Sequence, residues 1–512
     1  MISIRGSITS KIDPLDPRFT KIVEASARLA QKDATLWGPD AQAEAKVRLN
    51  WVDLPSTSRA LLPELDALAA KFRNFDRVIL CGMGGSSLAP EVIAATFKKS
   101  LLVIDSTDPD YISRALNGDL ARSVFVVSSK SGSTIETSSQ RSLFESQLIS
   151  AGLNPTDHMV IVSDPGSPLD RDARAKNFHV VNADPNVGGR FSALSAFGLV
   201  PAALLGIDVS ALLDSADDAL ALLQGPQSPA VTLAYLMSYE CGQYFALSDY
   251  QSGMPGLSDW IEQLVAESTG KNGTGRLPIV IEGPNSSIGS QVLTLAFAGK
   301  GDLVIEADLG AHFIFWEWVT ALIGFALEID PFNQPNVTEA KERTTALLKT
   351  WSGSLPHFAP LHTEDWVEIF SNATSVQEEL THLVDLVAPD GYISIMAYLD
   401  RLEDVQLGEL REILAQKSSR PVTFGWGPRF LHSTGQFHKG GQQNGVFLQI
   451  TGAVENDIMI PGRDFTFATL ITAQALGDGE ALSSRQLPVV RLHLKNRAQG
   501  IAQILSAARA II

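Results

Sequence analysis

Cysteine is scarce in this chain: its 512 residues include only two, Cys81 and Cys241. A chain of this length with two cysteines has no disulfide framework. No cluster of cysteine and histidine has the spacing of a zinc site, so we expect no bound metal.

Positive charge is also limited. Lysine and arginine number 40 against 57 acidic residues, which gives a formal net charge of -17. A nucleic-acid-binding protein normally carries a basic surface, so this balance argues against such a partner. A few local cations are enough to hold a phosphate, and an anionic substrate stays compatible with the charge.

Long hydrophobic runs are missing as well. The N-terminal MISIRGSITS has no apolar core of a signal peptide. The stretch that we identify as most apolar, 197–213, contains Pro201 and Asp208 and is shorter than the roughly 20 residues of a membrane span. We therefore expect a soluble, cytoplasmic protein with no membrane partner.

Short, continuously apolar runs alternate with helical patterns from about residue 73. Such runs are typical of parallel strands that are buried on both faces. Strand–helix alternation predicts right-handed βαβ units and an α/β fold with parallel sheets. The predicted strands are 77–81, 101–105, 124–129, 159–164 and 178–183, then 277–282, 302–307, 392–399, 420–425, 446–452 and 489–494; the predicted helices include 88–98, 135–150, 312–327, 336–350, 375–387 and 466–475.

The pattern divides the chain into four predicted segments. Residues 1–60 are expected to be helical, and 61–210 to form a first α/β domain. Residues 211–275 are expected to form a helical bridge, and 276–512 a second α/β domain with C-terminal helices. Ligands of such sheets bind beyond the carboxyl ends of the strands, so the residues that follow the strands are the candidate site.

The first candidate motif is CGMGGSSLAP (81–90), between a predicted strand and a helix. Its glycines, Gly85 among them, allow close backbone approach to a ligand, and Ser86 can cap a helix that favours an anion. It is neither a Walker loop nor a dinucleotide fingerprint. A plain strand-to-helix turn is an equally good explanation of this motif alone.

A second motif, VVSSKSGSTIET (126–137), makes phosphate binding the better explanation. It again follows a strand and opens a helix, and its donors are hydroxyls with one ammonium group. A solvated serine-rich loop is the alternative, which five donors between a buried strand and a helix disfavour. The donors are Ser129, Lys130, Ser131, Ser133 and Thr134.

Two further motifs place charged groups near helix ends. Gly189 and Arg190 precede a strongly apolar helix, so Arg190 could stabilise an oxyanion at a cleft edge. Gln263 and Glu267 are four residues apart and share a helix face. Glu267 lies in the last turn, where the helix dipole disfavours a negative charge, and this suits a general base. The alternative for Arg190 is a structural ion pair, and the alternative for Glu267 is an ordinary exposed carboxylate.

The last motif is the loop 424–445, which follows a strand and is rich in proton carriers. Loops of this composition often carry function, although one or both histidines could be satisfied core residues. Its candidates are His432, Gln436, His438 and Lys439.

Several blocks together resemble glucose-6-phosphate isomerases. They are GMGGSSLAP, SSKSGSTIET, GGRFSALSAFGLVPAAL, WIEQLVAESTGK and LGAHFIFWEWVTALIGFALEIDPFNQPNV, which occur in family order between about residues 70 and 340. The blocks KDATLWG, LNWVDLP and GPRFLHSTGQFHKGG resemble more narrowly the isomerase half of bifunctional transaldolase/glucose-6-phosphate isomerase fusions. No transaldolase-like segment precedes them, so we expect a stand-alone relative or the isomerase half alone.

The resemblance implies tandem sugar-isomerase (SIS) domains of flavodoxin-like αβα architecture, a phosphosugar substrate and no cofactor. It implies that Glu267 moves a proton between C1 and C2 and that Arg190 stabilises the enediolate. Gln263 matches a substrate-binding glutamine, and Lys439 is taken as the C-terminal active-site lysine. The family's phosphate loop matches Ser129, Lys130, Ser131 and Thr134, with Ser86 beside it.

One departure concerns ring opening. Typical members carry a catalytic histidine in a GQHAFYQL-like block, whereas the corresponding 278–297 has none. The role then falls to His432, His438, Lys439, a water or a histidine of a neighbouring subunit, and we favour His432 or His438.

The resulting prediction is reversible isomerisation of glucose-6-phosphate and fructose-6-phosphate. A phosphomannose or dual-specificity isomerase is the alternative enzyme, and a non-catalytic phosphosugar-sensing SIS protein is the alternative of another class. A homodimer and a relation to a transaldolase stay open.

Overall fold

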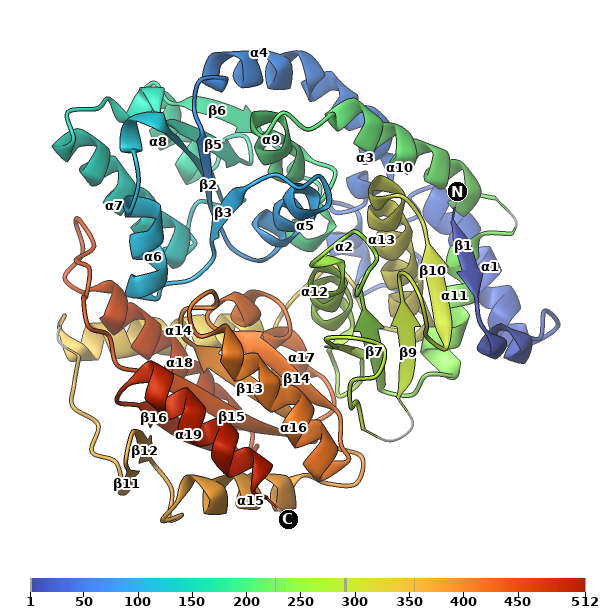
Figure 1. Ribbon diagram of the computed structural model, residues 1–512. Coiled ribbons are helices and arrows are strands. Elements are labelled where there is room, and N and C mark those ends of the chain that lie inside the picture. The colour runs from blue at the N-terminus through green and yellow to red at the C-terminus, as the bar shows by residue number, and fades with distance from the viewer. Residues whose placement is uncertain (1, 226, 290–291, 354, 512) are drawn as a thin grey trace.

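Three β-sheets and the helices that cover them make up the described part of the protein (Figure 1). The computed structural model describes residues 2–225, 227–289, 292–353 and 355–511. The outer limits of the first and last predicted segments, residues 1 and 512, therefore lie outside the described residues. Mixed α/β structure with mainly parallel pairing confirms the predicted fold class.

The N-terminal sheet has the strand order β3-β2-β4-β5-β6, and its strands are parallel. Its strands are β2 (Arg77–Gly82), β3 (Leu101–Ile104), β4 (Ser123–Ser128), β5 (Met159–Ser163) and β6 (His179–Asn182). The surrounding helices are α4 (Leu62–Phe72), α5 (Leu88–Thr96), α6 (Pro109–Leu116), α7 (Ile135–Ser150), α8 (Pro168–Ala175) and α9 (Ala196–Leu204).

Side-chain alternation along β2 explains why this sheet is covered on both faces. Val78 and Leu80 belong to the apolar cluster that includes α4, α5 and α9. Ile79 and Cys81 belong to the cluster that includes α6, α7 and α8. Successive side chains of a strand point to opposite faces, so a continuously apolar run requires helices on both.

The C-terminal sheet has the order β11-β12-β16-β15-β13-β14. Its strands are β11 (His362–Glu364), β12 (Val367–Ile369), β13 (Tyr392–Tyr398), β14 (Val422–Trp426), β15 (Gly445–Gly452) and β16 (Val489–Leu494). Its helices are α15 (Val376–Leu386), α16 (Glu409–Ser418), α17 (Gly435–Gly440), α18 (Phe467–Ser483) and α19 (Arg497–Arg509). The parallel order β14-β13-β15-β16 repeats the order β3-β2-β4-β5 of the N-terminal sheet.

The third sheet was not predicted. It has the order β1-β10-β9-β7-β8, with strands β1 (Ser3–Arg5), β7 (Tyr244–Ser248), β8 (Leu277–Val280), β9 (Leu293–Ala296) and β10 (Leu303–Glu306). The strands expected at 277–282 and 302–307 are present, but they pair with β7, β9 and β1 and not with the C-terminal sheet. The segments expected to be helical, 1–60 and 211–275, thus also contribute strands. The four-segment domain division itself stays a prediction.

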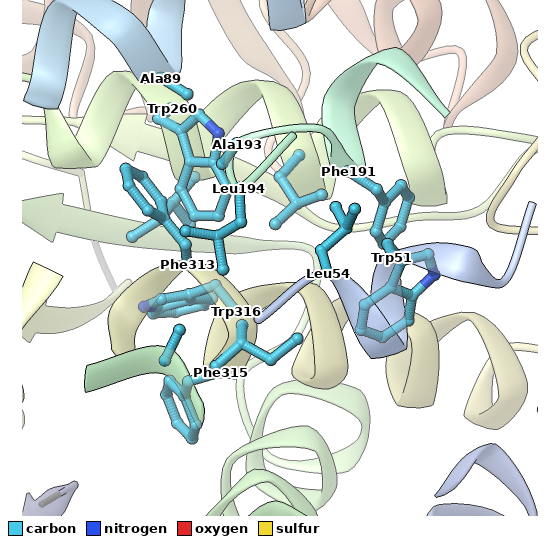
Figure 2. Close-up of a cluster of buried hydrophobic side chains, with 14 of the residues drawn as sticks. Trp51, Leu54, Ala89, Phe191, Ala193, Leu194, Trp260, Phe313, Phe315 and Trp316 are labelled. Atoms are coloured by element: carbon cyan, nitrogen blue, oxygen red, sulfur yellow. The ribbon is translucent and has the colours of Figure 1, made fainter. Parts of the chain in front are cut away.

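Helix α13 (Leu309–Ala326) runs through the main apolar core. Its Phe313 ring packs edge-on against Trp260, with ring centroids 4.8 Å apart, and Trp316 lies in the same cluster (Figure 2). Among the described residues, α13 is the one helix that is both long enough and apolar enough to cross a membrane. However, 89% of it is buried inside the protein. The sequence interpretation centred on 197–213 passed over this longer apolar segment.

The remaining helices join the sheets. They are α1 (Pro17–Ala30), α2 (Gln42–Ala45), α3 (Leu54–Thr57), α10 (Val209–Leu223), α11 (Pro229–Tyr239), α12 (Leu257–Thr269) and α14 (Val337–Trp351). Of these, α12 and α14 bring side chains to the carboxyl ends of the N-terminal strands.

Candidate active site

A cleft of about 280 Å³ lies beyond the carboxyl ends of β2 and β4. The strand order reverses between these two strands, which is where ligands bind in sheets of this kind. Residues from both halves of the sequence form its walls. They are Met83, Gly84, Gly85, Ser86, Ser128, Ser129, Lys130, Ser131, Thr134, Gly189, Arg190, Gln263, Glu267, Gln334, Val337, Thr338, Lys341, Leu431 and His432.

The floor of the cleft consists of two backbone turns in close contact. Gly84 has φ of +56°, a left-handed conformation that glycine adopts without strain. A Cβ on Gly85 would lie 2.0 Å from the carbonyl oxygen of Gly189. Any side chain at position 85 would therefore separate the turn after β2 from the turn that carries Arg190.

The hydroxyl-rich loop after β4 forms one wall. Ser129 Oγ accepts a hydrogen bond from Gly132 N at 3.1 Å, and the Ser131 and Ser133 hydroxyls lie 2.7 Å apart. The Lys130 ammonium pairs with Asp164 at 2.6 Å, and burial lowers the pKa of Lys130. The loop thus presents hydroxyl and backbone donors to the cleft, with one cation anchored beside it.

Arg190 and Glu267 meet across the cleft. Arg190 Nη1 lies 3.2 Å from Glu267 Oε1, and Gln263 Nε2 donates to Glu267 Oε2 at 3.1 Å. Arg190 Nη2 also donates to the Pro331 carbonyl at 2.6 Å, and Nε donates to Ser268 Oγ at 2.7 Å. Both oxygens of the carboxylate are therefore held by side chains that themselves line the cleft or its base.

His432 belongs to a hydrogen-bonded chain that links the two halves of the molecule. Its Nε2 lies 2.9 Å from Oε1 of the buried Glu136, which also accepts from Gln474 Nε2 at 2.7 Å. Gln474 Oε1 accepts from Thr107 Oγ1 at 2.6 Å. Burial acts to raise the pKa of Glu136, but the attraction and hydrogen bond of His432 outweigh it, so the pKa is lowered. A histidine whose ring is held by an ionised carboxylate is suited to proton transfer.

Four of the predicted residues lie outside the cleft lining. Ser133 and Lys439 line an adjoining cavity, and Lys439 is buried in an ion pair with Asp478 at 2.5 Å. Gln436 donates to the Gly270 carbonyl and to Asn336.

The fourth, His438, is a satisfied core residue. It is 2% exposed, and its ring nitrogens face Tyr392 Oη at 2.8 Å and Ser394 Oγ at 3.3 Å. Burial holds the pKa of His438 well below its usual value. The structure thus brings His432 to the cleft and not His438.

Sequence reasoning missed Glu136, Gln334 and Lys341. Lys341 projects from α14 into the cleft, and Gln334 accepts from Arg190 Nη1 at 3.0 Å. A signal for all three was present. Glu136 lies in the block SSKSGSTIET, and Gln334 lies in the block 309–337, both of which resemble the family. Lys341 is four residues beyond the end of the block 309–337. The candidate lysine predicted from the sequence was Lys439, in the loop 424–445.

No group of three or more His, Cys, Asp or Glu side chains is placed to hold a metal ion in the part of the chain that the structure describes.

Comparison with known proteins finds similar sequences. A sequence model of the family described as phosphoglucose isomerase matches residues 66–276. The probable glucose-6-phosphate isomerase of Haloarcula marismortui is 32% identical over 266 residues, which are 50% of this chain and 59% of the relative. The glucose-6-phosphate isomerase of Methanocaldococcus jannaschii is 28% identical over 282 residues, which are 50% of this chain and 69% of that one.

A solved structure shows the same fold. The crystal structure of a glucose-6-phosphate isomerase from Chlamydia trachomatis aligns with a TM-score of 0.55 and 19% identity. The alignment covers 69% of this chain and 89% of that one.

The fold is of the α/β class, and the cleft lies at the switch point of its parallel N-terminal sheet. Over residues 66–276 the chain is similar to the phosphoglucose isomerase family, and its similar relatives carry the same description. It spans 59% and 52% of the lengths of the first two curated relatives that it matches.

Proposed function

We propose that the protein interconverts glucose-6-phosphate and fructose-6-phosphate, with Glu267 as the base. The observation that carries the proposal is that Glu267 lines the same cleft as Ser129, Ser131 and Thr134 of the hydroxyl-rich loop. A substrate whose phosphate is held on that loop has its sugar carbons within the cleft that contains the carboxylate.

The phosphate docks first. Hydroxyls and backbone N–H groups at the start of α7 are donors for its oxygens, and the positive end of the helix favours the charge. Ser86, from the turn after β2, faces the same space. Lys130 contributes a positive charge that Asp164 partly offsets.

Ring opening is assigned to His432. Its contact with Glu136 orients the imidazole, so that it can exchange a proton with the ring oxygen of the sugar. His438 lacks access to the cleft and does not take this role.

Glu267 then removes the proton from C2 of the open aldose, which leaves a cis-enediol(ate), and returns it to C1. Arg190 and Gln263 hold the carboxylate in position. Arg190 stabilises the negative charge that develops on the substrate oxygen, as preorganised donors do in other sites.

Lys341 takes the role that the sequence suggested for Lys439. It lines the cleft, whereas the Lys439 ammonium is paired with Asp478. An ammonium at this position attracts the anionic substrate and the developing oxyanion.

A coupled assay with fructose-6-phosphate tests the proposal. Glu267→Gln should lower kcat by about 10²–10⁴-fold, because the amide cannot accept the proton, and should leave KM within a few-fold. Glu262→Gln on the same helix is the matched control. Burial raises the pKa of Glu262 well above its usual value, and Glu262 is not among the residues that line the cleft, so its amide replacement should keep turnover. Full turnover in Glu267→Gln would remove Glu267 from the mechanism.

Comparison of rates on mannose-6-phosphate and glucose-6-phosphate distinguishes the alternative isomerases. A phosphosugar sensor of the SIS type needs the hydroxyl loop but not Glu267, Arg190 and Lys341 together, so this combination favours an enzyme. A cytoplasmic glycolytic or gluconeogenic role, a homodimer and a relation to a transaldolase complete the proposal. The resemblance of 427–441 to the fused enzymes supports the last of these.

A further inference from the structure

A second cavity, also of about 280 Å³, lies in the C-terminal half of the protein. It is next to the carboxyl ends of β13 and β15, where Tyr398 and Gly452 are the last strand residues. The strand order reverses between β13 and β15 as it does between β2 and β4. The cavity therefore has the place in the C-terminal sheet that the cleft has in the N-terminal sheet, and the two share no lining residue.

Arg491 supplies a cation to this cavity. Its guanidinium lies 3.7 Å from the ring centroid of Phe370 and 5.4 Å from that of Phe358. Among the described residues, no side-chain hydrogen bond or ion pair of Arg491 is present. Stacking fixes the plane of the guanidinium and leaves its edge N–H groups for an acceptor with two oxygens.

Neutral polar groups also line this cavity. Thr451 Oγ1 lies 2.9 Å from His493 Nδ1, and burial lowers the pKa of His493 to about 4, so the ring is neutral at pH 7. Tyr398 is 2% exposed, and its hydroxyl has no hydrogen-bond partner in the described part of the chain. A buried hydroxyl without a partner is costly unless a ligand or water satisfies it.

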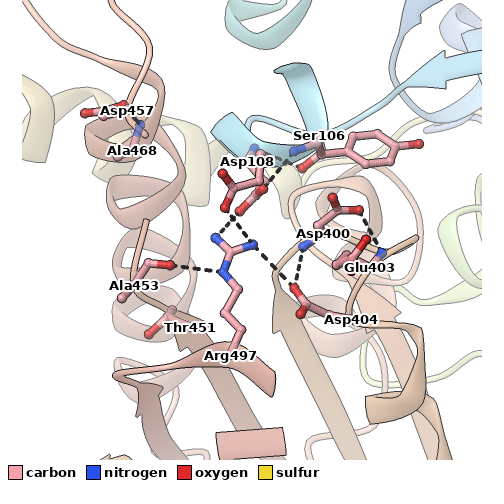
Figure 3. A network of polar contacts seen from close by, with 12 residues as sticks. Ser106, Asp108, Asp400, Glu403, Asp404, Thr451, Ala453, Asp457, Ala468 and Arg497 are labelled. Atoms are coloured by element: carbon pink, nitrogen blue, oxygen red, sulfur yellow. Dashed lines mark hydrogen bonds and ion pairs between the residues drawn. The ribbon is translucent and has the colours of Figure 1, made fainter. Parts of the chain in front are cut away.

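The acidic residues at the cavity limit what can bind. Asp108 is neutralised by Arg497 at 2.6 Å, and Figure 3 shows this pair beside Thr451. Glu368 lines the wall as an acceptor for hydroxyl groups. Ile471 and Leu476 of α18 supply apolar surface for a carbon chain.

We propose that this cavity is a binding site for a small polyhydroxylated anion, whose carboxylate or phosphate pairs with Arg491 and whose hydroxyls reach Glu368 and Thr451. The site is separate from the catalytic cleft, and the inference does not depend on the proposed isomerase activity.

Calorimetric titration of the full chain tests the site. Ser131→Asp places a carboxylate in the hydroxyl loop and excludes anions from the cleft, so that binding in this variant reports the second cavity. D-Glycerate is the carboxylate probe and glycerol 3-phosphate is the phosphate probe. One saturable site per chain for either probe supports the proposal, and the probe that binds identifies the anion.

Adding Arg491→Met should weaken that binding about tenfold or more, because methionine keeps an apolar contact with Phe370 but cannot donate. Arg509→Met, at the exposed end of α19, is the charge-matched control and should leave binding unchanged. Thr472→Leu fills the cavity without a change of charge and should also block binding. No saturable binding up to roughly 10 mM of either probe, or binding unaffected by Arg491→Met and Thr472→Leu in folded protein, overturns the proposal.

Discussion

At the scale of single residues, two lysines have opposite surroundings. Lys341 is exposed at the cleft, and Lys439 is buried against Asp478. We expect Lys341→Met to lower kcat/KM by about 10–10²-fold, because a cation near the substrate is lost, with little change in thermal stability.

Lys439→Met should act on stability instead. It leaves the Asp478 carboxylate buried without its partner, which costs about 3–5 kcal/mol. Urea unfolding measures this cost, and the double variant Lys439→Met/Asp478→Leu should recover most of it. If Lys439→Met instead lowers turnover at unchanged stability, Lys439 has a direct role in catalysis.

The residues of the cleft could be predicted in part. Motif and position along the chain suffice to predict Gly85, Ser86, Ser129 and Arg190, which follow strands, and Gln263 and Glu267, which share one face of α12. His432 and His438 are in the same loop, and local sequence does not distinguish them. Only tertiary packing shows that one ring faces Glu136 and the other faces Tyr392.

At the scale of elements, α18 couples to the cleft through Gln474. Its amide donates to Glu136, which in turn holds His432. We expect Gln474→Leu to raise the pKa of Glu136, since a donor to the ionised carboxylate is lost.

Protonation of Glu136 breaks its attraction to His432, so the acid limb of the kcat/KM profile should move to higher pH. The expected displacement is about one pH unit, from a hydrogen bond of roughly 1.5 kcal/mol to a charged group. Thr107→Val, one step further along the chain of bonds, should displace the limb less. A uniform loss of activity at all pH values would indicate a merely structural role for Gln474.

Most strands and helices could be predicted from apolar runs, because burial on both faces leaves a clear local signal. The pairing of β8 with β7, and of β10 with β9 and β1, could not be predicted in this way. Strands of three to six residues carry no information on their partners, and β1, 300 residues away in the chain, completes that sheet.

At the scale of the whole molecule, ion pairs join the N-terminal and C-terminal sheets. Arg497, at the start of α19, pairs with Asp108 and lies 3.4 Å from Asp404 (Figure 3). Burial raises the pKa of Asp404 to about 6 from 3.8. The folded state therefore binds this proton more tightly than the unfolded state, and stability falls as pH rises from about 4 to 6.

Asp404→Asn should remove that loss. The full pKa difference corresponds to about 3 kcal/mol, which partial solvent access reduces to about 1–2 kcal/mol. Thermal unfolding should show the variant more stable than the wild type at pH 7.5 and equal to it near pH 4. A variant that is less stable at pH 7.5 would show that the contact with Arg497 outweighs the cost of burial.

Proton transfer by Glu267 is the central claim, and the origin of the hydrogen that the product gains at C2 in D₂O tests it most directly. Glucose-6-phosphate that the wild-type protein forms from fructose-6-phosphate should carry solvent deuterium at C2, because the protonated carboxyl exchanges with water before it returns the proton. The Glu267→Gln variant should bind the substrate but incorporate almost no solvent deuterium at C2. Product formed without any solvent deuterium, or full incorporation by Glu267→Gln, would contradict the account.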